Sequence, residues 1–208
     1  MSGFAEGYFI VFGGLALLGA VAAVYFYLQD RKEAQTQSGI LKRKMNREYQ
    51  NLVNDFIKRC RQNFGNHLKA AALYGSVARG SAQLTSDIDF ILVFDILPKV
   101  RCKRMDMIFP LVWEAENSRA AQVLRNKGFY PSISPLLYTI EEIERTQPIL
   151  LDITEDGVIL FDNGVLTNKL QRLRERLKEL GAKRVVHEDG SMYWDLKPDW
   201  RPGEEIEL

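Results

Sequence analysis

The stretch that decides the fold is residues 70–94, AAALYGSVARGSAQLTSDIDFILVF. It predicts a buried strand that ends at the turn Gly75-Ser76, a short helix, and a second strand that starts with Asp87 and Asp89. Side chains alternate along a strand, so these two carboxylates share one face, with their α-carbons about 7 Å apart. Two carboxylates beside a phosphate-sized turn indicate a site that holds divalent metal against a nucleotide.

Residues of the turn fit the same chemistry. Gly75 has no Cβ, so the backbone and a phosphate can approach closely there. Ser76 supplies a hydroxyl and an N–H at the start of the predicted helix. Arg79 follows one turn later and is either a phosphate ligand or a solvated surface charge. Magnesium takes few protein ligands, so Asp87 and Asp89 are predicted as its ligands and as the catalytic residues.

The spacing of Gly75-Ser76 and Asp87-Ile-Asp89 resembles the hallmark of the DNA polymerase beta-like nucleotidyltransferase superfamily, and most closely its minimal and kanamycin-type members. The resemblance implies an α+β nucleotidyltransferase fold, a mixed sheet flanked by helices, over residues 40–162. It implies that the Gly-Ser turn binds a nucleoside triphosphate, with ATP expected, and that the acidic pair holds Mg²⁺ in a two-metal site. The implied reaction transfers a nucleoside monophosphate to an acceptor hydroxyl, which the sequence does not identify.

The chain departs from this family at one position. Active members usually carry a third carboxylate on the next strand, but the strand predicted over residues 129–138 has Ser132 and Ser134 and no acid. We take Ser134 as the vacant third-ligand position, with Ser132 as the alternative, and expect either a substrate-supplied base or Glu141 to stand in. The second metal then lacks its usual bridging ligand. The alternative function is therefore a catalytically weak or inactive nucleotide-binding module, regulatory or antitoxin-like.

Residues 163–208 are predicted as a small extension made of an amphipathic helix, a hairpin and a polar tail. Together with Ser134-Pro-Leu-Leu-Tyr, the tail sequence Trp194-Asp-Leu-Lys-Pro resembles an archaeal nucleotidyltransferase subgroup. Basic residues of the helix would suit a nucleic-acid partner. Glu175 and Glu179 interrupt them, so a solvated outer face is the preferred interpretation.

Residues 8–28, YFIVFGGLALLGAVAAVYFYL, contain no charge and are long enough to cross a bilayer as a helix. Ala20-Val-Ala22 mimics a signal-peptide cleavage site, but the segment lacks a basic start and stays apolar beyond that point. A buried core helix is the other alternative. We therefore predict a retained membrane span, with residues 1–7 as a short external tail and 29–39 as a linker.

The charges beside this span predict its orientation. Glu6 precedes it without any Lys or Arg, whereas Arg31, Lys32 and further basic residues follow it. Basic flanks stay on the cytoplasmic side, so we expect a single-pass protein of the cell membrane with a cytoplasmic C-terminal domain. The partners expected are thus the membrane, a nucleoside triphosphate and an unknown acceptor.

Length and composition set wide limits. The chain has 208 residues and a net charge of +1, which allows one domain with an appendage and indicates no polyanionic partner. Cys60 and Cys102 are its only cysteines, too few for a disulfide scaffold and without Cys-x-x-Cys spacing.

The remaining pattern is helical with one further strand. Residues 40–64 and 164–180 show helical periodicity, and residues 100–127 show a helix that Pro110 should kink or divide. Thr139 and Glu142 match a capping box, and residues 158–161 match a strand.

Overall fold

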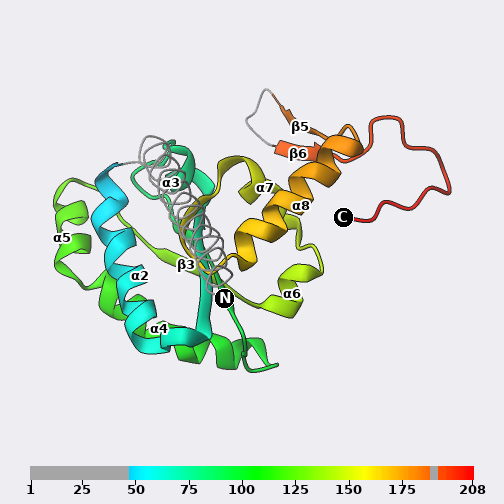
Figure 1. The fold of residues 1–208 in the computed structure, drawn as a ribbon. Coiled ribbons are helices and arrows are strands. Elements are labelled where there is room, and N and C mark those ends of the chain that lie inside the picture. The colour runs from blue at the N-terminus through cyan, green and yellow to red at the C-terminus, as the bar shows by residue number, and fades with distance from the viewer. Residues whose placement is uncertain (1–46, 188–191) are drawn as a thin grey trace, which may run out of the picture. The chain divides into compact units, whose positions relative to one another are not determined.

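Four strands form one mixed sheet (Figure 1). The computed structural model describes residues 47–187 and 192–208, and the strand order is β3-β2-β1-β4. Strand β1 runs antiparallel to both of its neighbours, whereas β2 and β3 run parallel to each other. The mixed sheet expected from the sequence is confirmed. The strands are β1 (Leu68–Tyr74), β2 (Ile88–Phe94), β3 (Ile133–Thr139) and β4 (Val158–Asp162).

Helices lie on both sides of the sheet, with α2, α4 and α5 on one side and α6, α7 and α8 on the other (Figure 1). The short α3 directly follows β1, and all of these elements belong to one compact unit, Lys44–Leu208. The helices are α2 (Gln50–Phe64), α3 (Gly75–Arg79), α4 (Arg101–Glu116), α5 (Arg119–Asn126), α6 (Ile140–Glu144), α7 (Pro148–Asp156) and α8 (Val165–Glu179), with 3-10 turns η1 (Arg47–Tyr49) and η2 (Gly65–His67) on either side of α2.

The two central strands, β1 and β2, have continuous apolar sequences because they lie in the core. Both β1 and β2 are buried on both faces, so neither face leaves room for polar side chains in the middle of the strand. On one face Phe90 of β2 packs against Phe56 of α2, with ring centroids 4.8 Å apart. On the other face Ala70 and Ile91 pack with leucines of α7 and α8. Polar groups are consequently confined to the strand ends.

Strand β3 starts later than the sequence predicts. It covers Ile133–Thr139, whereas residues 129–132 approach it outside the ladder, where the N–H of Tyr130 donates to the carbonyl of Leu84 at 2.7 Å. Pro131 has no N–H to give to a neighbouring strand. Strand β3 lies at an edge of the sheet, where a strand tolerates proline. The capping box at the end of β3 is also confirmed, with the Thr139 side chain accepting from the Glu142 N–H.

The helical region after β2 divides at Asn117 and not at Pro110. Helix α4 continues through Pro110, which is exposed, so the carbonyl that loses its partner there faces water. Ser118 then caps α5 by accepting from the N–H of Ala121 at 3.3 Å. Helix α7 was not predicted, although Pro148 at its first turn is a helix-start signal.

The C-terminal hairpin joins β5 (Lys183–Val186) and β6 (Met192–Asp195), which pair antiparallel as predicted. It is attached to α7 by two side chains. Arg184 Nη1 lies 2.5 Å from Asp156 Oδ2, and Trp194 Nε1 donates to Asp152 Oδ1 at 3.1 Å.

The predicted tail 1–7, span 8–28 and linker 29–39 lie outside the described residues, as do residues 40–46 of the first predicted helix. None of the helices in residues 47–187 and 192–208 has the length and apolar character that crossing a membrane requires. The expected division of the chain into an external tail, a span, a linker, a catalytic domain and an extension stays a prediction.

Candidate active site

Three neighbouring strands bring Tyr74, Asp89 and Ser134 together at one end of the sheet. In the ladder, Asp89 is the partner of Tyr74 on one side and of Ser134 on the other. The Ser134 hydroxyl beside Asp89 acts to lower the pKa of that carboxyl group. The residue taken from sequence as the vacant third-ligand position therefore adjoins the proposed metal ligand, whereas Ser132 precedes the strand.

Gly75 brings the backbone of the turn against this carboxylate. It follows Tyr74 directly, begins α3 and has φ +74°. A Cβ at this position would overlap Asp89 Oδ2 and stand 3.2 Å from its Cγ. Only glycine tolerates both the positive φ and this approach. Ser76 comes next, half-buried at the start of the short helix.

Asp87 lies just outside the strand. Strand β2 begins at Ile88, so Asp89 is in the ladder while Asp87 is exposed in the preceding loop. The charge of Asp87 nevertheless acts on Asp89, whose pKa it raises. The structure thus brings together the predicted pair, though not as two residues of one strand.

The environment of Asp89 opposes its negative charge. Burial and the neighbouring Asp87 raise its pKa above the usual 3.8, while the Arg79 guanidinium and the Ser134 hydroxyl act in the opposite direction. Burial, followed by the charge of Asp89, also raises the pKa of Tyr74, which keeps its phenol protonated. A half-buried carboxylate whose neighbours do not fully neutralise it is a site where a cation is favourable.

The residues present fit magnesium held jointly with a substrate. Within residues 47–187 and 192–208, no group of three or more His, Cys, Asp or Glu side chains could hold a metal. A complete protein cage of the kind zinc uses is therefore not found among them. Two carboxylates suit Mg²⁺, which binds through one or two such groups and completes its shell with water and phosphate. Asp89 and Asp87 are the residues that would hold it.

Arg79 lies between two acidic groups. It acts on the pKa of Asp89, and its Nη1 is 4.0 Å from Asp156 Oδ2. Asp156 is also bound by Arg184 of the C-terminal hairpin. Sequence reasoning missed Asp156 and Arg184, because no local pattern links a helix end to a hairpin with a long helix between them.

The two acids after β3 are not at the site. Thr139 pairs with Phe94, at the opposite end of β3 from Ser134, and Glu141 follows it. Glu141 is bound by Arg145 Nη2 at 2.7 Å, and Glu142 is held by Arg104. The expectation that Glu141 stands in for the third carboxylate is therefore wrong: strand length separates it from Asp89.

Comparison of the sequence with known proteins gives a matching family and a relative. The sequence profile of the nucleotidyltransferase domain family matches residues 53–196. A protein of Methanocaldococcus jannaschii named "Putative protein adenylyltransferase" is 28% identical over 133 residues, which span 62% of this chain and 84% of that protein.

Solved structures with some similarity include a "putative nucleotidyltransferase" from Sulfolobus solfataricus, at 21% identity and a TM-score of 0.35, covering 62% of this chain and 86% of that one. Another is spectinomycin adenyltransferase from Enterococcus faecialis with ATP and spectinomycin, at 14% identity and a TM-score of 0.39, covering 62% of this chain and 66% of that one. We base no assignment on likenesses at these scores.

A mixed sheet flanked by helices, with a glycine turn against an acidic strand start, defines an α+β protein. With more than half of its length matched, the chain belongs to the nucleotidyltransferase domain family. It is accordingly an enzyme of the nucleotidyltransferase type, and the resemblance drawn from the motif is confirmed.

A Gly75→Ala variant should lose nucleotide binding, because its Cβ would displace the Asp89 carboxylate. Displacement of about 1 Å at a reacting centre can reduce activity by about a hundredfold. Gly181→Ala is the matched control, since Gly181 has φ +65° and a Cβ there meets nothing within 4 Å. Calorimetry should show weaker Mg-ATP binding for the first variant alone, although both incur a backbone strain of about 1–2 kcal/mol. Equal binding by the two variants would show that the close approach has no role.

An Asp89→Asn variant should be more stable than wild type at pH 7 without metal. Because burial and Asp87 raise the Asp89 pKa, the folded state loses stability as pH rises from the usual pKa of 3.8 through the raised value. The stability advantage of the variant over wild type should therefore shrink as pH falls below 3.8. Adding Mg²⁺ should stabilise wild type more than the variant. Thermal unfolding across pH measures both effects.

Asp95→Asn, directly after the end of the same strand, is the control and should behave in the opposite sense. Burial acts to raise the pKa of Asp95, but hydrogen bonds with His67 and Lys69 leave it lowered. Removing that charge should destabilise the protein at pH 7. An Asp89→Asn variant that is likewise destabilised at pH 7 would contradict the account of an unneutralised carboxylate.

Proposed function

We propose that this protein transfers AMP from ATP to an acceptor hydroxyl in an Mg²⁺-dependent reaction. The observation that carries this proposal is the position of Asp89, held between the Gly75 turn and Ser134 with a raised pKa. Membership of the nucleotidyltransferase family supports the transfer chemistry. The name of the Methanocaldococcus jannaschii relative supports ATP as donor and makes a protein hydroxyl the first acceptor to test.

In the proposed reaction, an acceptor oxygen attacks the α-phosphorus of ATP. The bond between that phosphorus and the oxygen leading to the β-phosphate breaks, and pyrophosphate leaves. The acceptor's proton passes to a base from the substrate or to solvent. Gly75 allows the triphosphate close to the turn, Ser76 offers its hydroxyl and N–H, and Arg79 offers positive charge. When bound by Asp87 and Asp89, Mg²⁺ would neutralise the phosphate charge.

Ser134 is the reason to expect slow transfer. It is the ladder partner of Asp89, at the position where the family usually places a third acid. A hydroxyl neither carries the charge that a second metal requires nor takes a proton from the acceptor. The alternative function, a nucleotide-binding module with little or no turnover, is favoured by this same residue.

The proposal is tested with full-length protein, ATP labelled at the α-phosphate, Mg²⁺ and cell lysate. Label should enter an acceptor with wild type at a rate below about 1 s⁻¹, and not with an Asp87→Asn/Asp89→Asn variant. Asp95→Asn, a carboxylate change at the other end of β2, should retain transfer. Ser134→Asp should raise the rate. Mg-ATP binding without transfer in wild type and in Ser134→Asp would favour the binding module.

We also propose that residues 8–28 anchor the protein in the cell membrane with residues 29–208 in the cytoplasm. The uncharged segment and the basic residues after it support this. Deleting residues 1–37 should move the protein from the membrane fraction to the soluble fraction. A C-terminal tag on the full chain should be protected from protease in right-side-out vesicles. A cleaved tag would reverse the orientation and remove the catalytic part from its ATP.

A further inference from the structure

A hollow lies at the opposite end of the sheet from the candidate active site. It has a volume of about 710 Å³ and lies between the C-terminal half of α2 and strand β4. Leu68, at the start of β1, belongs to its wall, whereas Tyr74 at the other end of β1 adjoins Asp89. Six residues of extended strand separate the two places by about 20 Å. The hollow is therefore neither the nucleotide site nor its immediate acceptor region.

The wall of this hollow is cationic and rich in amides. Helix α2 contributes Lys58 and Arg61, and the described residues of the wall include no Asp or Glu. Amide side chains come from α2, from the turn after it and from the end of β4: Asn54, Gln62, Asn66 and Asn163. The residues Asn54, Lys58, Arg61 and Gln62 follow one another at helical spacing and so share one face of α2.

The carboxylates nearest in sequence are turned to other partners. Asp55 is bound by Arg59 Nε at 2.9 Å, and Asp162 accepts from the backbone N–H groups of Leu166 and Thr167 in α8. Among the described residues, neither acid forms an ion pair with Lys58 or Arg61.

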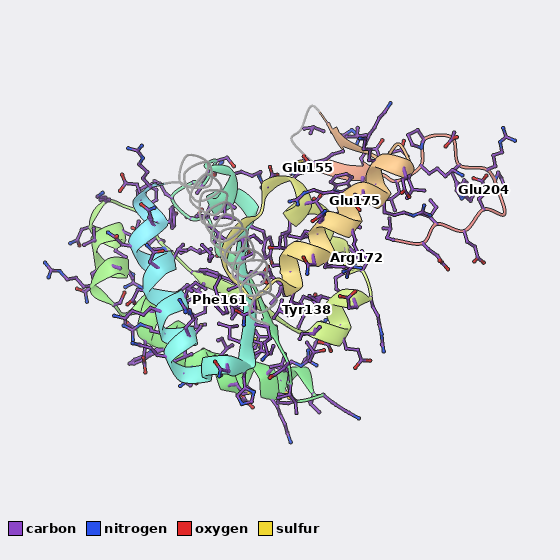
Figure 2. The ribbon with its side chains drawn as sticks, in the orientation of Figure 1. Tyr138, Glu155, Phe161, Arg172, Glu175 and Glu204 are labelled. Atoms are coloured by element: carbon purple, nitrogen blue, oxygen red, sulfur yellow. The ribbon has the colours of Figure 1, made fainter. Side chains whose placement is uncertain are left out.

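Arg61 is exposed and contacts one aromatic ring. Its guanidinium carbon lies 4.7 Å from the centroid of the Phe161 ring (Figure 2 shows Phe161 alongside α2). Stacking on a ring uses the face of the guanidinium and leaves its N–H edges available. Those edges match the oxygens of a phosphate, and the ring reduces the freedom that binding would otherwise remove.

We propose that this hollow binds a phosphate-bearing ligand, separately from the proposed nucleotide transfer. Its volume is in the range of small-molecule sites, about 300–1,000 Å³, but its wall is polar and cationic where such sites are usually apolar. Two cations and four amide groups, with no carboxylate among the described residues of the wall, favour a compact, multiply charged anion with several acceptor oxygens. Free phosphate compounds carry this group, and so do the lipid headgroups of the membrane predicted to anchor the chain.

The test uses ¹⁵N-labelled full-length protein in a neutral maltoside detergent without Mg²⁺, titrated with inorganic phosphate and followed by backbone amide resonances. Resonances of residues 58–66 and 160–163 should shift with saturation, and sodium acetate at equal ionic strength should not reproduce this. A Lys58→Gln/Arg61→Gln variant should bind about tenfold more weakly or worse, since it loses two charge-assisted contacts. Lys99→Gln/Arg101→Gln, two exposed cations elsewhere, is the matched control and should bind as wild type.

A second arm identifies the source of the phosphate. Soluble dihexanoyl phosphatidylglycerol replaces inorganic phosphate in the same titration. Saturable shifts with either probe, lost in the Lys58→Gln/Arg61→Gln variant, support the site, and the stronger probe shows whether a headgroup or a free phosphate fits. No shift in this region with both probes, or equal shifts in that variant, would overturn the proposal. Activity is not the readout, so failure here leaves the proposed transfer reaction untouched.

Discussion

Strand β1 is paired on both edges and covered by helices on both faces, and this double burial constrains everything around it. Its middle residues are alanines and leucines, because an unpaired polar group there would lose its water without replacement. Chemistry is therefore possible only where the strand ends. At that point Tyr74 passes directly into Gly75, and the chain turns against the carboxylate of the neighbouring strand. The rigid sheet fixes the distance between turn and carboxylate.

Without a ligand, the ionised Asp89 carboxylate lowers the stability of the folded protein. Asp89 is partly buried and is affected by a second carboxylate, and the Arg79 guanidinium and the Ser134 hydroxyl offset these effects only in part, so its pKa stays raised. Such a group is retained where a cation or substrate completes it. Ser134 repels Asp89 less than a third acid would, because its hydroxyl carries no negative charge and acts to lower the pKa of Asp89. A serine in place of an acid at this position would therefore favour folding but weaken the binding of a second metal.

The C-terminal extension is connected to this site. Arg184 and Trp194 of the hairpin bind acids of α7, and Asp156, one of those acids, also faces Arg79. The hairpin thus contributes to the electrostatic surroundings of a residue proposed to contact phosphate. The ion pair is largely sheltered from water, which makes it sensitive to the removal of one partner. A domain boundary placed after β4 would separate Arg184 from Asp156 and Arg79, which interact with one another.

Sequence by itself determined the local elements and the family. The apolar runs of β1 and β2, the Gly75-Ser76 turn and the acidic pair are visible because strand burial, turn geometry and metal chemistry restrict residue types within a few positions. What the tertiary structure decided are relations between distant segments. The pairing of β2 with β3 placed Ser134 beside Asp89 and carried Glu141 to the far end of the strand. The meeting of α7 with the hairpin joined Asp156 to Arg184, and the packing of α2 beside β4 assembled the cationic hollow. These contacts depend on how faces of helices and strands pack, and packing is set by the whole core and not by neighbours along the chain.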